Sequence, residues 1–91
     1  MKEPTYHLQI TGKVQGVYYR KSTQAEARKL ELKGWVKNEA DGSVSAEVQG
    51  DKGKVQEFIA WCRQGPPGAR VDQVKLTELE KPPFHSFEII R

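Results

Sequence analysis

The 91-residue sequence predicts an α+β protein in which two helices cover one face of a mainly antiparallel sheet. Segments with a two-residue hydrophobic period alternate with two segments of helical period. The resulting order is β-α-β-β-α-β, with one extra strand at the C-terminus. The pair Asp41-Gly42 marks a hairpin between the second and third strands. This order is typical of the ferredoxin-like sandwich.

The first half of the chain contains a strand, a helix and a short second strand. Residues 6–11 alternate, with Tyr6, Leu8 and Ile10 on one face, and Gly12 is expected to end that strand. From residue 19 to about residue 33 the spacing is helical, and Gly34 is expected to stop the helix. The buried face of that helix is predicted to hold Tyr19, Thr23, Ala27 and Leu30. Residues 35–38 then form the second strand.

The second half begins with the return strand of the hairpin, residues 43–49. Its inward side chains are predicted to be Val44, Ala46 and Val48, and its outward ones Ser43, Ser45, Glu47 and Gln49. Asp51 is positioned to cap a second helix, whose apolar stripe is Val55, Phe58, Ile59 and Cys62. The run Gly65-Pro66-Pro67-Gly68 ends this helix. Strands over 70–79 and 84–91 follow, separated by Pro82-Pro83.

Length and composition predict a single domain over residues 1–91 that is cytoplasmic. No apolar run is long enough for a membrane span, and no secretory signal follows Met1. With one cysteine, Cys62, neither an internal disulfide nor a cysteine-based zinc site can form. The net charge of +3 comes from 15 basic and 12 acidic residues scattered along the chain. Without a basic block, a single anionic group suits this surface better than a polyanion.

The topology brings distant residues to one edge of the sheet. A right-handed crossover makes the first two strands run in the same direction, so both end where the first helix begins. The loop 13–17, Arg20 and Asn38 are therefore expected to converge. If the hairpin strand lies between the first two strands, their ends are about 10 Å apart.

The loop before the first helix has the features of an anion-binding site. Gly12 and Gly16 bracket it, and the helix N-terminus adds unpaired N–H groups. Arg20 lies in the first helical turn, where the positive dipole end disfavours a cation. Its planar guanidinium suits bidentate binding of phosphate. A salt bridge to a surface carboxylate is an equally good interpretation of Arg20 from spacing alone.

Asn38, the only asparagine, is predicted to end its strand on the face that carries Val36. Its amide could orient a water molecule without acting as a base. Taken alone, a turn residue before Asp41-Gly42 is the better supported interpretation.

The chain offers no nucleophile for covalent catalysis. His7 and His85 lie in strand segments and are interpreted as packed or solvated residues, and Cys62 as a core residue. No metal-binding histidine pair, nucleophile elbow or nucleotide-binding glycine loop occurs. A hydrolase with these residues would use water directly, on a substrate with a good leaving group.

Two stretches resemble the signatures of the acylphosphatase family. The first is Ile10-Thr11-Gly12-Lys13-Val14-Gln15-Gly16-Val17-Tyr18-Tyr19-Arg20, and the second is Gly34-Trp35-Val36-Lys37-Asn38 with Gly42, Val44 and Gly50. The likeness continues through Gly65-Pro66-Pro67, Ala69 and Val71, and so spans nearly the full chain. The family is also ferredoxin-like.

The resemblance implies a metal-free and cofactor-free hydrolase that splits small acyl phosphates into a carboxylate and inorganic phosphate. It implies that Arg20 binds phosphate with the backbone of Gln15, Gly16, Val17, Tyr18 and Tyr19. It further implies that Asn38 orients the attacking water, with Gly12 and Thr23 in supporting positions. Tyr19 departs from the Phe or Met usual in that position, and its hydroxyl must find a partner or solvent. We expect a monomer without a membrane or nucleic-acid partner.

The main alternative is a non-catalytic module that binds an anion, nucleic acid or a protein. RNA-recognition domains share the strand and helix order, but they stack bases on exposed aromatic side chains of the sheet. The third strand here has serine, glutamate and glutamine at its outward positions, which argues against RNA. Both Arg20 and Asn38 are present, which argues against a degenerate relative that only binds anions.

Overall fold

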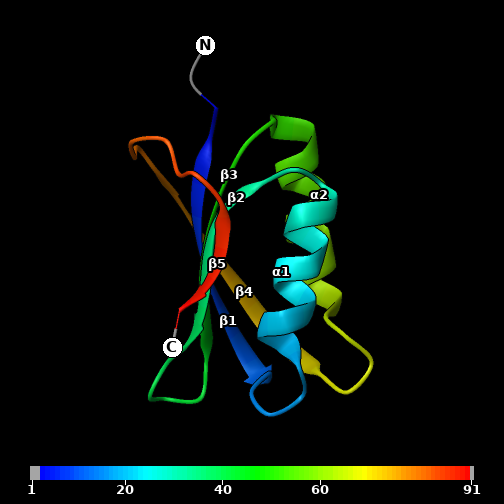
Figure 1. Ribbon diagram of the computed structural model, residues 1–91. Helices are drawn as coiled ribbons and strands as arrows, with labels where there is room; N and C mark the ends of the chain where they lie inside the picture. The colour runs from blue at the N-terminus through cyan, green and yellow to red at the C-terminus, as the bar shows by residue number, and fades with distance from the viewer. Residues whose placement is uncertain (1–2, 91) are drawn as a thin grey trace.

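The computed structural model describes residues 3–90 and has both helices on one face of a five-stranded sheet (Figure 1). The elements are β1 (Thr5–Lys13), α1 (Tyr19–Lys29), β2 (Lys33–Asn38), β3 (Val44–Gln49), α2 (Lys52–Gln64), β4 (Arg70–Leu79) and β5 (Phe87–Ile90). The sheet order is β4-β1-β3-β2-β5. All pairs are antiparallel except the β2–β5 pair, which is parallel. The predicted ferredoxin-like sandwich with an extra C-terminal strand is confirmed.

The core lies between the sheet and the two helices. The predicted inward residues of β3, Val44, Ala46 and Val48, are fully buried. The α2 stripe is also buried, and Asp51 caps this helix by accepting a hydrogen bond from the Lys54 N–H. Burying such apolar faces is the main term that stabilises a small two-layer domain.

The first helix is shorter than predicted. It ends at Lys29, and the chain reverses through Leu30 and Glu31, which has a φ of 59°. Helices commonly end on a residue in this left-handed region, and glycine was expected to provide it. Gly34 instead lies inside β2, where its α-carbon packs against the Glu47 carbonyl of β3. The prediction that Gly34 stops the helix is therefore wrong.

Gly12 also lies within a strand rather than at its end. β1 continues to Lys13, and the pairing of β1 with β4 shifts register between Thr11 and Gly12. The φ of Gly12 is +126°, and a Cβ there would collide with the Arg70 carbonyl. Glycine is required here because the backbone of β4 approaches so closely at this bulge.

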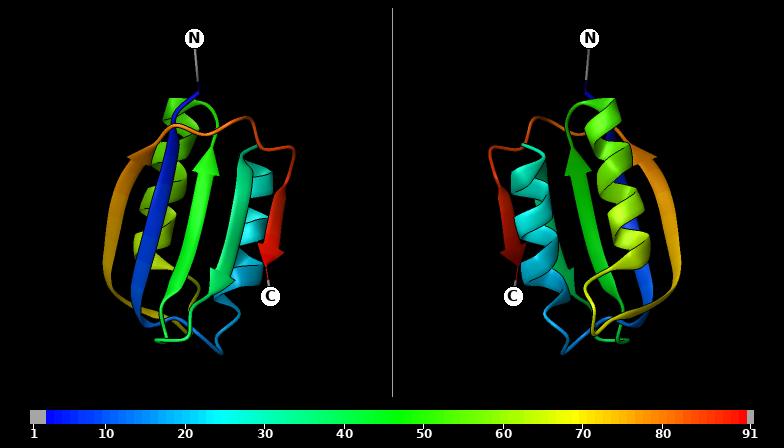
Figure 2. Two further views of the ribbon diagram at one scale, coloured as in Figure 1. Left: turned by 90° about the vertical axis from the view of Figure 1, so that its left-hand side faces the viewer. Right: turned by 90° about the vertical axis from the view of Figure 1, so that its right-hand side faces the viewer.

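The outward side chains of the third strand were predicted to be exposed, but the structure buries them. Ser43, Ser45, Glu47 and Gln49 are 3–7% exposed. β3 is the central strand, and the segment 80–86 crosses one end of the sheet on its way to β5 (Figure 2). Gln49 donates a hydrogen bond to Thr5 Oγ1 and accepts one from the Phe84 N–H, while Glu47 pairs with His7 and Lys81. These contacts from neighbouring strands and from the crossing segment cover the polar row.

The predicted final strand over 84–91 is confirmed only for Phe87–Ile90. Arg91, like Met1 and Lys2, lies outside the described residues, so the structure does not describe the ends of the predicted 1–91 domain. Neither helix within residues 3–90 has the length and apolar character needed to cross a bilayer.

Candidate active site

The ends of β1 and β2 lie at the same edge of the sheet, on either side of β3. Ile10 of β1 and Asn38 of β2 both pair with Val44 of β3. Two strand spacings separate them, or about 10 Å. The predicted convergence of these strand ends with the start of α1 is confirmed, because one cavity of about 440 Å³ adjoins all three.

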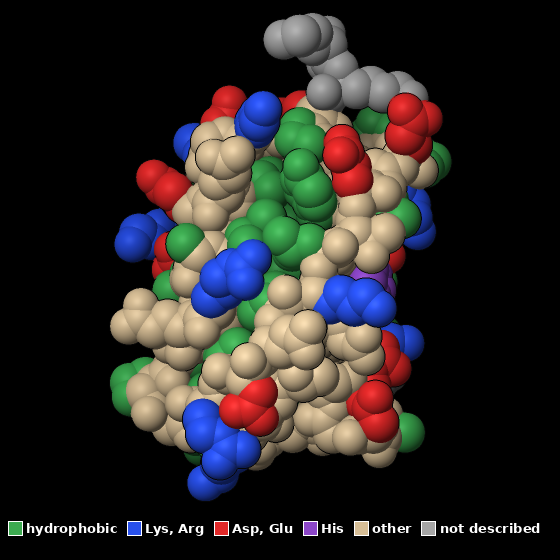
Figure 3. Space-filling model, turned by 180° about the vertical axis from the view of Figure 1, so that it is seen from behind, with side chains coloured by type: hydrophobic (Ala, Val, Ile, Leu, Met, Phe, Trp, Pro, Cys, Tyr) green, Lys and Arg blue, Asp and Glu red, His purple; other side chains and the backbone are tan. Residues whose placement is uncertain are grey.

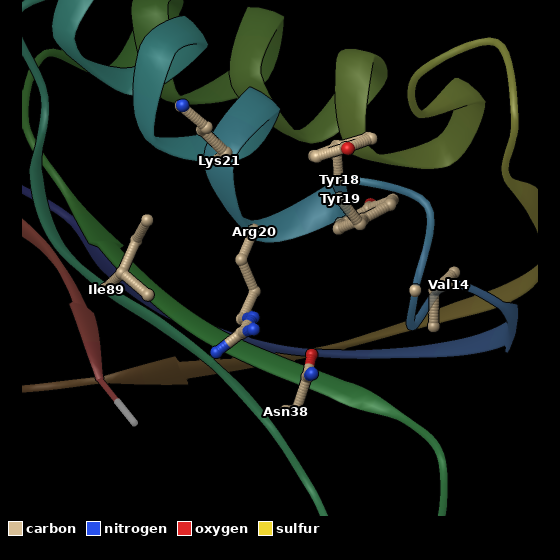
Figure 4. A pocket seen from close by; sticks show the side chains of 8 residues that line it. Val14, Tyr18, Tyr19, Arg20, Lys21, Asn38 and Ile89 are labelled. Carbon is tan, nitrogen blue, oxygen red and sulfur yellow. The ribbon is translucent and has the colours of Figure 1, made fainter.

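The cavity is lined by Val14, Gly16, Tyr18, Tyr19, Arg20, Lys21, Asn38 and Ile89. In Figure 4 the Arg20 guanidinium and the Asn38 amide point toward one another at its centre. The loop, the helix start and the end of β2 thus each supply polar groups to one space. A cavity of this size is within the range of small-molecule sites.

Arg20 is half-buried, and no carboxylate among the described residues neutralises its charge. None of the ion pairs formed within residues 3–90 involves its guanidinium. The salt bridge to a surface carboxylate, which the spacing left open, is therefore not formed with any carboxylate of residues 3–90. A half-buried guanidinium with its donors directed into a cavity favours an anionic ligand.

The N-terminus of α1 has no side-chain cap. Tyr18 occupies the capping position with a φ of 61°, and no acidic residue lies in the first turn. The first intrahelical bond runs from the Ser22 N–H to the Tyr18 carbonyl, so the preceding N–H groups have no helical partner. Gly16, with a φ of 76°, turns the loop immediately before them. Uncapped N–H groups and the positive end of the helix dipole both favour a bound anion.

The Asn38 amide is oriented by the end of β2 and not by a turn. Its Oδ1 is buried and has no hydrogen-bond partner within the described part of the chain. The turn is instead stabilised by Asp41, whose carboxylate accepts bonds from the N–H and the hydroxyl of Ser43. These two bonds lower the pKa of Asp41. A buried, unpartnered acceptor is costly, so Asn38 Oδ1 points to a ligand or a water molecule.

Gln15 and Val17 do not line the cavity with their side chains. The Gln15 amide donates two bonds of 2.8 Å, to the carbonyls of Glu39 and Ser43. It therefore links the loop to the β2–β3 hairpin that follows Asn38. Val17 packs against the core. Any contact of these two residues with a ligand would come from their backbone.

Gly12 and Thr23 lie behind the cavity. Gly12 forms the bulge against β4, and Thr23 is buried with its hydroxyl bonded to the Tyr19 carbonyl at 2.7 Å. Both therefore act on the shape of the loop and of the first helical turn. The sequence did not indicate Val14, Lys21 or Ile89 as cavity residues. For Lys21, its place directly after Arg20 was an available signal, whereas the place of Ile89 depends on the pairing of β5 with β2.

The Tyr19 hydroxyl has found a buried partner. It donates a 2.7 Å bond to the Cys62 carbonyl near the end of α2. The residue four positions after Cys62 is Pro66, which has no N–H, so the usual helical donor to that carbonyl is missing. Burial of the hydroxyl raises the pKa of Tyr19 well above its usual value. The bond links the start of α1 to the end of α2.

Fold and cavity together define a small ferredoxin-like protein with an arginine, an asparagine and an uncapped helix start around one site. The acylphosphatase family model matches residues 6–89. The chain belongs to the acylphosphatase family.

Individual acylphosphatases are similar to this chain over most of their lengths. The chain is 51% identical over 76 residues to an acylphosphatase of Thiobacillus denitrificans, covering 84% of this chain and 85% of the relative. It is 44% identical to one of Thermococcus kodakarensis, covering 99% of both. A solved acylphosphatase structure from Bacillus subtilis superposes with a TM-score of 0.93 at 35% identity, covering 97% of this chain and 99% of that one. These likenesses support acylphosphatase function, so the predicted enzyme class is confirmed.

Proposed function

We propose that this protein hydrolyses acyl phosphates by direct attack of water, with the phosphate held by Arg20 and the water oriented by Asn38. The observation that carries the proposal is the unpartnered state of both groups at one cavity. The guanidinium has no ion pair and Asn38 Oδ1 has no hydrogen bond within residues 3–90. Both groups are costly to hold in this way unless a ligand completes them.

In the proposed reaction the phosphate lies against the start of α1. Arg20 and the free N–H groups from Gly16 to Tyr19 neutralise its oxygens, which makes the phosphorus more open to attack. Asn38 Oδ1 accepts a hydrogen bond from the attacking water and fixes its direction. The bond between phosphorus and the acyl oxygen breaks, and the carboxylate leaves with the electron pair. The water proton ends on the phosphate product.

This scheme assigns no nucleophile and no general acid to the protein. A carboxylate is a good leaving group at neutral pH, so its departure needs no proton. Positioning and charge stabilisation then carry the catalysis, as in other phosphoryl transfers. We therefore propose that the reaction is independent of metal ions. No group of three or more metal-binding side chains gathers within residues 3–90.

The test is the hydrolysis of benzoyl phosphate by the purified protein with excess EDTA. We expect turnover in the wild type, and a loss of roughly 10- to 100-fold in kcat/KM for Arg20→Ala, the size of one charge-assisted contact. Inorganic phosphate should inhibit the wild type competitively and Arg20→Ala much less. Arg63→Ala is the matched control, because it removes an exposed arginine in the last turn of α2. It should behave as the wild type.

The Asn38→Ala variant separates the two roles. We expect its inhibition by phosphate to be unchanged, while kcat falls by roughly 10²–10³, as for the loss of one positioned transition-state group. A wild-type rate in this variant would contradict the water-orienting role. If the folded wild type bound phosphate but had no turnover, the non-catalytic anion-binding alternative would be the correct function.

The single domain over 1–91, the monomeric state and the cytoplasmic location stay predictions from the sequence, as does the absence of a nucleic-acid partner. The groups proposed to bind the phosphate and the water all lie in one chain, at or next to one cavity.

A further inference from the structure

Lys21 is a second cation at the cavity, and the proposed reaction does not use it. It lines the cavity directly after Arg20 and is exposed. None of the ion pairs within the described residues involves its ammonium group. It also lies in the first turn of α1, where the helix dipole disfavours a positive charge. Neither helix stability nor a protein partner therefore explains a lysine at this position.

The cavity has two sides. In Figure 4, Lys21 and Ile89 lie on one side of Arg20, whereas Val14, Tyr18 and Tyr19 lie on the other. The second side contains the loop and the uncapped helix start, which is where the proposed function puts the phosphate. With the phosphate there, the side with Lys21 and Ile89 is the part of the cavity that is left for the acyl part of a bound substrate.

The chemistry of this side is apolar near the sheet and cationic at the rim. Ile89 is half-buried on β5 and offers a hydrocarbon surface. In Figure 4 the Lys21 side chain points away from the Arg20 guanidinium. Its ammonium is thus separated from the phosphate-binding groups, and its flexible stem can reach a charge on the far end of a substrate.

We propose that Lys21 and Ile89 make this enzyme prefer acyl phosphates whose acyl part is a hydrocarbon spacer ending in a second anionic group. Ile89 contacts the spacer, and Lys21 pairs with the terminal anion. This inference rests on the proposed function, since it assumes that the phosphate binds at Arg20.

The test compares substrates that differ only in one charge. Benzoyl phosphate has no second charge, 3- and 4-carboxybenzoyl phosphate add a carboxylate, and the matching carbamoyl compounds replace it with a neutral amide of similar shape. The variants are Lys21→Met, which keeps the length of the side chain, and Lys29→Met. Lys29 is the matched control because it lies in the last turn of the same helix, outside the cavity lining.

We expect the wild type to prefer at least one carboxy isomer over its carbamoyl counterpart in kcat/KM by about threefold to fivefold, the effect of an exposed ion pair. Lys21→Met should abolish this preference, whereas Lys29→Met should retain it. Higher salt should reduce the wild-type preference because the pair is exposed. Thermal unfolding of both variants verifies that they are folded.

Three outcomes would overturn the inference. The wild type does not discriminate between carboxy and carbamoyl substrates, or Lys21→Met keeps the preference, or both lysine variants lose it equally. In each of these cases turnover of benzoyl phosphate still supports the proposed function. If the folded wild type hydrolyses none of these substrates, the proposed function fails and the inference fails with it.

Discussion

Removing the Tyr19 hydroxyl should destabilise the protein without impairing its chemistry. Tyr19→Phe deletes the 2.7 Å bond to the Cys62 carbonyl. That carbonyl has no alternative helical donor because Pro66 lacks an N–H, and Tyr19 is only 2% exposed, so water cannot replace the hydroxyl. A buried carbonyl left without a partner costs about 1–3 kcal/mol. For a domain of this size, a loss of about 2 kcal/mol lowers Tm by roughly 8–16 °C.

The assay is thermal unfolding followed by circular dichroism, with urea titration as a second measurement. The m-value should stay constant, because the substitution hardly changes the surface area that becomes exposed on unfolding. Tyr6→Phe is the matched control: Tyr6 is half-buried, and its hydroxyl makes no hydrogen bond within residues 3–90. Benzoyl phosphate turnover at 25 °C should be retained in both variants. An unchanged Tm for Tyr19→Phe would refute the reasoning.

The same bond predicts a difference at alkaline pH. Because burial raises the pKa of Tyr19 in the folded state, its contribution to stability is intact below the unfolded pKa of about 10. Above that pH the unfolded chain loses the proton first, and the free energy of unfolding falls by about 1.4 kcal/mol per pH unit for this group. Tyr19→Phe should lack this part of the alkaline loss. Equal slopes in the two proteins would mean that the hydroxyl is not held in a buried bond.

Three further predictions concern the loop, the bulge and the core. Gln15→Ala should lower the free energy of unfolding by about 1–2 kcal/mol in urea titration, because it removes the bonds to Glu39 and Ser43. Gln15→Glu should lower it more, since a carboxylate would face two carbonyls; equal stability of Gln15→Glu and wild type would contradict this role. Gly12→Ala should separate β1 from β4 and lower Tm by more than Gln15→Ala, which thermal unfolding checks. Burial raises the pKa of Cys62 to about 12, so its thiol should stabilise the fold below the unfolded pKa of about 8.5 and lose that contribution as the pH rises toward 12. Cys62→Ala should show a shallower decline over that range in urea titration.

The Gln15 side chain links the loop before α1 to the β2–β3 hairpin, which carries Asn38 at its start. One of the carbonyls that accept its two bonds belongs to Glu39, directly after Asn38, and the other to Ser43, at the far end of the hairpin turn. The distance between the proposed phosphate-binding loop and the proposed water-orienting amide is therefore set by side-chain bonds as well as by strand pairing. Positioning of this kind is what a site without a nucleophile depends on.

The sequence by itself determined the order of elements, the faces of the strands and the edge at which Arg20 and Asn38 meet. Hydrophobic period, turn chemistry and the handedness of the crossover are local or nearly local properties, so one chain is enough to read them. Ile10 and Asn38 both pair with Val44 of β3, in agreement with the convergence of strand ends that these rules predict. The family signatures added the roles of the residues, which spacing alone left open.

Only the tertiary structure decided which distant segments pack against a given residue and cover it. Gly34 was expected to stop the first helix, but the helix ends earlier, at Leu30 and Glu31. Gly34 is needed instead because the backbone of β3 approaches it too closely for a Cβ. The outward row of β3 is buried because segment 80–86 and the neighbouring strands cover it (Figure 2).

The same holds for the cavity. Ile89 lines the cavity because β5 pairs with β2, which lies about 50 residues away along the chain. Figure 3 shows that hydrophobic side chains are visible at the surface on the side of the molecule that faces away from the viewer in Figure 1. Periodicity tells which face a side chain is on, but how completely that face is covered depends on segments that are distant in sequence. Packing and hydrogen bonding between such segments have no local signal, and for this reason only the folded chain reveals them.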